Sequence, residues 1–173
     1  MFGFGKKLKP LAVEVASLPL DILAVGRSVM TTEKSLFMDS QLVAERFARL
    51  LPDITNKTYP AYDITVTYRP DEDGKLRYYM GRCVKCEPDP PLERAEIERI
   101  PASLICAKIT VETKSVASWP VRQGKARQLF YETWLPASGL TQHSTIESIE
   151  LYGVESQNQI PSMDLYFPLA VEN

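Results

Sequence analysis

Leu18 to Gly26 read LPLDILAVG, and Ile100 to Ile109 read IPASLICAKI. In each stretch an apolar residue and a proline precede an apolar run, and the prolines at positions 19 and 101 stand 82 residues apart. A helix-patterned stretch and two strand-like segments follow each run. The chain therefore repeats a β-α-β-β unit, which is too long for a solenoid repeat and small for an independent domain.

Two units of this size are expected to pack as one domain about a pseudo-twofold axis. The predicted fold class is α+β, with antiparallel sheets, helices on one side, and a central pocket at the seam, where each half contributes walls. We place the half-repeats at about 13–86 and 99–171, with a charged, proline-rich linker at about 87–98. Residues 1–10 are expected to form a flexible basic tail ahead of a single domain, 11–173.

The helices are predicted from their apolar spacing and their end signals. Asp39 or Ser40 is the candidate N-cap of the first helix, which Pro52 would end. Residues 118–120 supply a cap and a first-turn proline for the second helix, and Leu135-Pro136 is expected to end it.

Period-two alternation and turn composition predict the strands. The clearest case is Tyr62 to Tyr68, where aromatic and β-branched residues share one face, followed by a turn-rich segment at 69–74. The first strand is predicted at one of two places. The predicted strands are 12–15 or 22–30, 62–68, 76–84, 104–111, 147–154 and 163–171.

Composition excludes several classes of function. The chain has 173 residues, 45% hydrophobic residues, a net charge of −2 and a pI near 5.5. It therefore lacks the basic surface of a nucleic-acid-binding protein. No apolar stretch approaches the roughly 18–20 residues of a spanning helix, and the N-terminus does not resemble a signal peptide. We expect a cytoplasmic protein that does not bind membranes.

Metal and nucleophile motifs are weak. Cys83 and Cys86 form a single C-x-x-C, Cys106 lies far away, and the chain has one histidine, His143, so no zinc site is predicted. The cysteines are interpreted as reduced structural thiols. The sequence contains neither a glycine-rich phosphate loop nor a nucleophile elbow, so we assign no catalytic residue, metal or cofactor.

Glu150 is the main candidate for a functional residue. It lies in Ile149-Glu150-Leu151-Tyr152, in the middle of the penultimate predicted strand. One interpretation is an exposed strand glutamate beside Glu147. The other is a carboxylate in a cleft, which is costly without a partner. The two closing strands contain no Lys or Arg, so an organic cation is the expected partner, with cation–π attraction of roughly 0.5–2 kcal/mol from each facing ring.

Aromatic residues supply candidate walls for that cleft. Trp119 stands at the start of the second helix, and the repeat offset relates it to Phe37 at the start of the first. Tyr78 lies on the return strand of the first half, and Met163 lies on its counterpart in the second. The alternative interpretation places all four in the core, where such residues are common.

Several segments together resemble the GyrI-like small-molecule-binding domain, also called the AraC-type effector-binding domain. The resemblance spans about 13–171 and consists of an ordered set of motifs rather than one decisive motif. The matching segments are YYMGR at 78–82, IPA at 100–102, ETWLPASG at 132–139, IELY at 149–152 and MDLYFPL at 163–169.

The resemblance implies a duplicated β-α-β-β fold and a pocket. In drug-sensing members, a glutamate of the penultimate strand lies at the pocket floor and meets lipophilic cations between aromatic rings. Glu150 matches that glutamate, and Trp119 and Phe37 fall near the aromatic positions. Many members carry a DNA-binding helix-turn-helix domain, for which this chain has no room. A free-standing binder would instead sequester the ligand or report it to a protein partner, and a homodimer is left open as well.

The hypothesis is therefore a free-standing domain that binds hydrophobic cationic small molecules through Glu150, Trp119, Phe37, Tyr78 and Met163. Two alternatives stay open because relatives of this fold include them. One is a hydrolase of cyclopropane-type genotoxins, in which the pocket glutamate would act on water. The other is a protein inhibitor of a topoisomerase. Haem binding is disfavoured because the single histidine is predicted in a turn.

Overall fold

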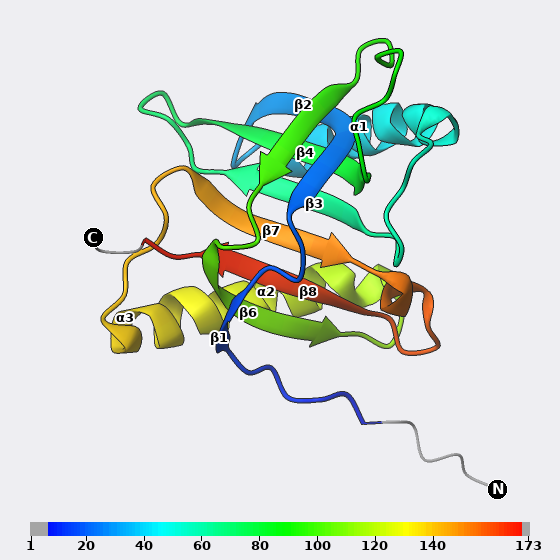
Figure 1. Ribbon diagram of the computed structural model, residues 1–173. Helices are drawn as coiled ribbons and strands as arrows, with labels where there is room; N and C mark the ends of the chain where they lie inside the picture. The colour runs from blue at the N-terminus through cyan, green and yellow to red at the C-terminus, as the bar shows by residue number, and fades with distance from the viewer. Residues whose placement is uncertain (1–6, 171–173) are drawn as a thin grey trace, which may run out of the picture.

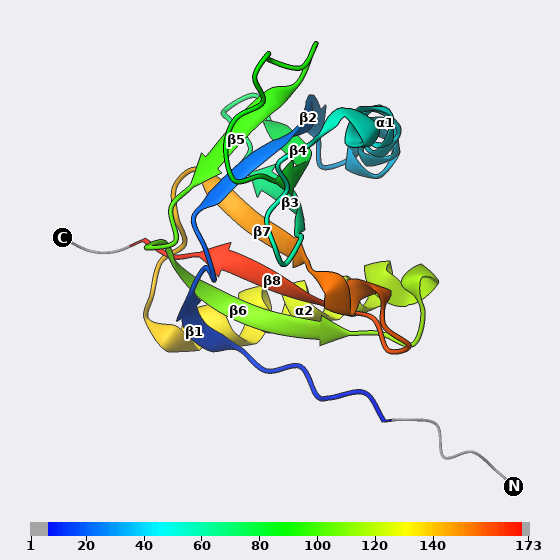
Figure 2. The same cartoon turned by 45° about the vertical axis from the view of Figure 1, so that its right-hand side comes forward.

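The computed structural model describes residues 7–170, which form one eight-stranded antiparallel sheet (Figure 1). The strand order is β1-β6-β8-β7-β3-β4-β2-β5. The sheet curls, and α1 and α2 lie against its two halves (Figure 2). The strands are β1 (Glu14–Ser17), β2 (Ile22–Thr32), β3 (Asp63–Tyr68), β4 (Lys75–Cys83), β5 (Glu96–Ile100), β6 (Ile105–Glu112), β7 (Ile146–Tyr152) and β8 (Ser162–Pro168). The helices are α1 (Leu36–Leu50), α2 (Trp119–Gln128) and α3 (Leu135–Ser138), with a π-helical segment (Leu129–Trp134) between the last two and short 3₁₀ turns at Leu51–Asp53, Val116–Ser118 and Val154–Gln157.

The strand order confirms the predicted duplication. Read outward from the central pair, β7 matches β3, β8 matches β4, β6 matches β2 and β1 matches β5. Shifting β1, β2 and α1 by 82 residues carries them onto 96–99, 104–114 and 118–132, which overlap β5, β6 and α2. The fold is therefore α+β, with two β-α-β-β units related by a pseudo-twofold axis.

The two edge strands are exchanged between the halves. β1 precedes the first unit but pairs with β6 of the second, and β5 precedes the second unit but pairs with β2 of the first. The structure therefore has a strand at each of the two places predicted for the first strand: β1 overlaps 12–15, and β2 covers 22–30. β5 begins at Glu96, so the last residues of the predicted linker at about 87–98 lie in a strand. Arg77 on β4 forms ion pairs with Glu96 (3.2 Å) and Glu98 (2.8 Å), which explains how a segment with loop-like charge lies in a sheet.

The first helix begins one turn earlier than the capping residues predict. Its N-cap is Ser35, whose side chain forms no capping hydrogen bond. Asp39 instead accepts a hydrogen bond from the hydroxyl of Thr31 at 2.6 Å, which ties the first turn of α1 to β2. The apolar residues Val43, Phe47 and Leu50 are buried against the sheet, as their spacing predicts.

The second helix begins at Trp119 as predicted, but Leu135-Pro136 does not end it. The π-helical segment follows α2, and α3 then continues to Ser138, where Gly139 adopts a left-handed conformation (φ 69°). Pro136 lies in the first turn of α3, where a residue without an N–H is tolerated. The change of helix type therefore allows a proline inside a continuous helical rod.

Strand alternation divides the buried side chains between the two faces of the sheet. One face holds a cluster that includes Ile64, Val66, Ile149 and Leu151. The other face carries two clusters, one beneath each helix, and Phe130 belongs to the cluster beneath α2. Neither α1 nor α2 packs directly over the central strands β3 and β7. The helix-facing side of these two strands is therefore available for polar side chains.

Part of the predicted tail contacts the rest of the domain. Residues 1–6 lie outside the described residues. Lys9 is held by Glu112, whose carboxylate accepts its backbone N–H at 2.9 Å and pairs with its ammonium at 3.2 Å. Arg122 also donates a hydrogen bond to the carbonyl of Lys9 at 3.1 Å. Within residues 7–170, no helix is long and apolar enough to cross a bilayer.

A pair of glycines tests the close strand contact in the first half. Gly26 on β2 lies opposite Gly81 on β4, and a Cβ atom on Gly26 would overlap the carbonyl oxygen of Met80. We expect Gly26→Ala to lower the free energy of unfolding by at least about 1–3 kcal/mol, because the backbones of β2 and β4 must move apart to admit the methyl group. Gly124→Ala, in open space on α2, is the control and should stabilise by up to about 1 kcal/mol. Urea unfolding measures both values, and an unchanged stability for Gly26→Ala would contradict the packing described.

Candidate functional site

A pocket of about 600 Å³ lies between α1 and α2, above the central strands. Residues from both helices and from β3, β4 and β7 line it. Because Ile149 and Leu151 face the opposite core, Ser148 and Glu150 on the same strand must point toward the helices. Strand alternation therefore places a carboxylate at the floor of the seam.

Glu150 is nearly buried, with 8% of its surface exposed, and both of its carboxylate oxygens accept hydrogen bonds. Arg127 of α2 donates from Nη2 to Oε1 at 3.0 Å, and the Tyr152 hydroxyl donates to Oε2 at 2.8 Å. Gln123 in turn donates to the Tyr152 oxygen at 2.9 Å. These contacts fix the position of the carboxylate.

The expectation that Glu150 has no cationic partner within the chain is wrong. The two closing strands lack Lys and Arg, but Arg127 reaches Glu150 from a helix 23 residues earlier in the sequence. Arg127 also donates to the Ser148 hydroxyl at 3.0 Å, and its guanidinium lies 5.9 Å from the ring centre of Phe167. The spacing of charged residues along a helix does not show which of their side chains will reach a neighbouring strand.

The pocket remains acidic despite this ion pair. Three carboxylates line it, those of Glu33, Glu147 and Glu150, against the single guanidinium of Arg127, so its lining residues carry a net charge of −2. Burial, assisted by the charge of Glu150, raises the pKa of the pocket tyrosines Tyr78 and Tyr152. Both phenols therefore stay protonated near neutral pH, and Tyr152 keeps its role as a donor.

The structure brings three of the five predicted residues together. Glu150, Tyr78 and Phe37 line the pocket, and Phe37 is 69% exposed. Trp119 and Met163 do not line it. Trp119 is buried behind Tyr152, with the two rings perpendicular and their centres 6.1 Å apart, and Met163 belongs to the core beneath α2.

Arg127, Tyr152 and Gln123 line the pocket but were missed by the analysis of the sequence. For Tyr152 a signal was present, because a residue two positions after Glu150 on a strand shares its face. For the two helix residues no comparable signal exists.

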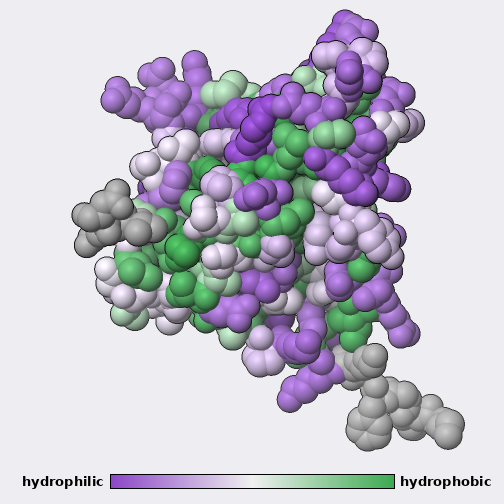
Figure 3. All heavy atoms as spheres, in the orientation of Figure 1, coloured by the Kyte–Doolittle hydropathy of each residue, from purple (hydrophilic) through white to green (hydrophobic). Residues whose placement is uncertain are grey.

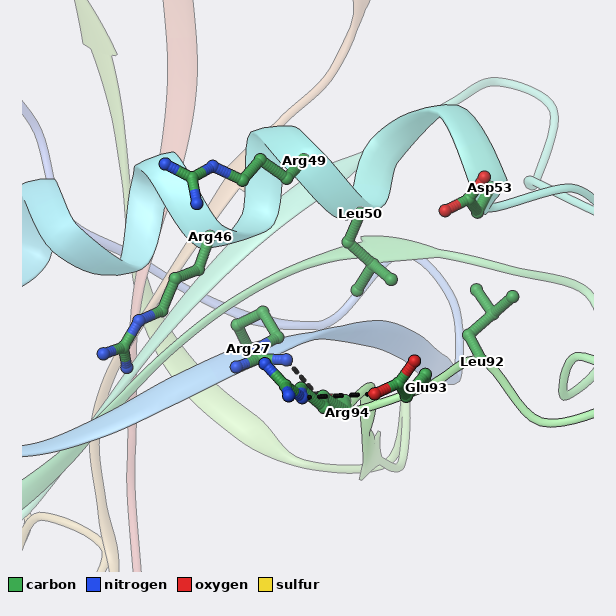
Figure 4. A pocket seen from close by; sticks show the side chains of 8 residues that line it. All are labelled: Arg27, Arg46, Arg49, Leu50, Asp53, Leu92, Glu93 and Arg94. Carbon is green, nitrogen blue, oxygen red and sulfur yellow. Dashed lines mark hydrogen bonds and ion pairs between the residues drawn. The ribbon is translucent and has the colours of Figure 1, made fainter.

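A larger groove of about 700 Å³ lies elsewhere, between α1, β2 and the segment before β5, and contains none of the predicted site residues (Figure 4). Arginines dominate it: Arg27, Arg46, Arg49 and Arg94. Arg27 donates to the carbonyl of Arg94 at 2.7 Å, which links β2 to that segment. Arg46 and Arg49 lie toward the C-terminal end of α1, where positive charge is favourable.

On the face shown in Figure 3, apolar side chains gather on the surface near the place where the described chain ends. A hollow of about 360 Å³ there is lined by Val15, Ile105, Leu140 and Leu169, among others. Among residues 7–170, no group of three or more His, Cys, Asp or Glu side chains is arranged to hold a metal ion. All three cysteines are free.

Comparisons with solved structures identify the fold. A structure of SAV2435 bound to tetraphenylphosphonium superposes with a TM-score of 0.66 at 12% identity, covering 92% of this chain and 94% of that one. The C-terminal domain of EcmrR matches with a TM-score of 0.61 at 14% identity, covering 96% and 100%. This chain shares the α+β fold of these two proteins, as the resemblance to the GyrI-like domain predicts. An integron cassette protein from Vibrio cholerae shares the fold as well (TM-score 0.64, 10% identity, 94% and 100% covered). No protein-family model and no curated protein matches the sequence.

The cysteines provide a test of the C-x-x-C interpretation. Burial raises the pKa of the Cys83 and Cys106 thiols to about 12, whereas Cys86 is exposed. Since the thiolate is the reactive species, we expect an aromatic disulfide reagent at pH 8 to modify one thiol per native chain rapidly. The other two should react only after unfolding in urea. Cys86→Ser should abolish the fast phase, and equal rates for all three thiols would contradict this assignment.

Proposed function

We propose that this chain binds hydrophobic cationic small molecules in the pocket between α1 and α2. The observation that carries the proposal is the acidic lining of the pocket, with Glu150 fixed at its floor beside aromatic walls. A second support is the shared fold with SAV2435, whose structure contains tetraphenylphosphonium, a hydrophobic cation.

Charge complementarity supplies the first part of the proposed recognition. The pocket retains a net charge of −2 after Arg127 is counted, so a monovalent cation entering it reduces an uncompensated negative charge. Glu150 is poorly hydrated because it is nearly buried, and Coulomb attraction is stronger there than at a protein surface.

Apolar contact supplies the second part. Phe37 stands exposed at the pocket wall contributed by α1, and Tyr78 and Tyr152 contribute ring surface from β4 and β7. Covering apolar surface contributes roughly 25 cal/mol per Å² removed from water. A volume of about 600 Å³ falls within the usual range for small-molecule sites.

Hydrolysis is the second candidate, because the Tyr152 hydroxyl contacts Glu150 and the two groups form a pair capable of acid–base work. Both oxygens of Glu150 are already engaged, by Tyr152 and by Arg127, which favours holding a charge over activating water. A bound ligand that is recovered unchanged and in stoichiometric amount supports binding, and multiple turnovers of a cyclopropane-bearing electrophile would support hydrolysis.

Substitution of the floor carboxylate tests the proposal. We expect Glu150→Gln to weaken tetraphenylphosphonium binding by about tenfold or more, the value of one interaction with a charged group. Isothermal titration calorimetry measures the dissociation constant. Glu98→Gln is the matched control, since Glu98 is equally buried at 8% exposure but pairs with Arg77 away from the pocket.

The control should bind like the wild type, and circular dichroism confirms that both variants are folded. Equal affinities for the wild type and Glu150→Gln would contradict the proposal.

A further inference from the structure

The guanidinium of Arg127 occupies a position that an incoming cation would also use. It donates to Glu150 at 3.0 Å and to Ser148 at 3.0 Å, and it lines the same pocket. Its side chain is 28% exposed, against 11% for the side chain of Glu150. The arginine is therefore the more accessible member of this ion pair.

We propose that Arg127 is an internal competitor for the ligand's positive charge and determines which cations bind. This inference rests on the proposed function and specifies the ligand class. A cation reaches Glu150 only if its remaining contacts compensate for the two hydrogen bonds that Arg127 gives up. Arg127 is thus a specificity-determining residue that acts by occupying the site.

A displaced Arg127 has a second carboxylate within its surroundings. Glu147 lines the same pocket and accepts a hydrogen bond from the Tyr131 hydroxyl at 3.1 Å. Burial and the charge of Glu147 raise the pKa of this phenol to about 12, so it stays protonated and remains a donor to Glu147 near neutral pH. Because Arg127 and Glu147 line the same pocket, an exchange of Glu150 for Glu147 would avoid leaving the arginine's charge unpaired, a costly state in a partly buried site.

The geometry also limits the ligand's size. When Arg127 withdraws, Glu150 keeps the hydrogen bond from Tyr152, so the ligand need not supply a donor. It must instead supply apolar area against Phe37, Tyr78 and Leu36. A large, weakly hydrated organic cation meets this requirement. A small, strongly hydrated cation has too little area, and a neutral molecule gains nothing from Glu150.

The substitution Arg127→Met removes the competing guanidinium and keeps an unbranched apolar side chain at this position. We expect Arg127→Met to bind tetraphenylphosphonium about tenfold to a hundredfold more tightly than the wild type, the factor that loss of a competing charge-assisted hydrogen bond yields. Detectable binding of tetramethylammonium should appear in the same variant only. Arg122→Met is the matched control, because Arg122 lies on the same helix and donates to backbone carbonyls of Glu112 and Lys9. Its affinity should equal that of the wild type.

A double variant and an anion of the same shape complete the test. In Arg127→Met/Glu150→Gln the gain should disappear, and tetraphenylborate should bind neither the wild type nor Arg127→Met. If Arg127→Met does not fold, Arg127→Lys replaces it. Lysine keeps the charge but cannot span Ser148 and Glu150 with a fork of donors, so a smaller gain is expected.

The results separate the two proposals. An unchanged or weaker affinity in the folded Arg127 variant, with the wild type binding and Glu150→Gln impaired, overturns the competitor inference and leaves the proposed function intact. Binding of tetraphenylborate that is lost in Arg127→Met also overturns it, because Arg127 would then be a ligand contact. No binding of tetraphenylphosphonium by any of these proteins would reject the proposed function itself.

Discussion

The pairing of β3 with β7 joins the two halves of the sheet, and the pocket depends on it. In this register Thr65 lies opposite Glu150 and Thr67 lies opposite Ser148. The same alternation sends Ile64, Val66, Ile149 and Leu151 into the opposite core. A slip by one residue would exchange these two sets, which would bury the polar side chains and expose the apolar ones. The core thus fixes the orientation of the pocket floor.

The helices complete the site because each covers only its own half. α1 packs over Val25 and its neighbours, and α2 packs over Ile109 and its neighbours, so the strands at the seam have no helix directly above them. Polar side chains are tolerated at such a position because they reach one another and the pocket interior. Glu150, Arg127 and Tyr152 form a connected set there, in which the charged groups are paired and hydrogen-bonded.

Much of the fold is predictable from sequence because the two halves of the chain repeat the same pattern of apolar runs. The offset between Pro19 and Pro101 predicts the symmetric strand order, and the alternation at 62–68 identifies a central strand. Element ends are predicted less well. Pro136 does not end its helix because the π-helical segment accommodates it. The acidic residues of β5 make its sequence look like a loop, and in the structure Arg77 pairs with them. The site shows the same division: strand register places Glu150 and Tyr78, whereas the partner from α2 depends on side-chain conformation across the seam.

The most direct measurement is a crystal structure of the protein with bound tetraphenylphosphonium. We expect the phosphonium in the pocket between α1 and α2, with a phenyl ring against Phe37 or Tyr78 and the Arg127 guanidinium withdrawn from Glu150. A ligand bound elsewhere, or one bound in the pocket while the Arg127–Glu150 ion pair stays closed at its present distance of 3.0 Å, would contradict it.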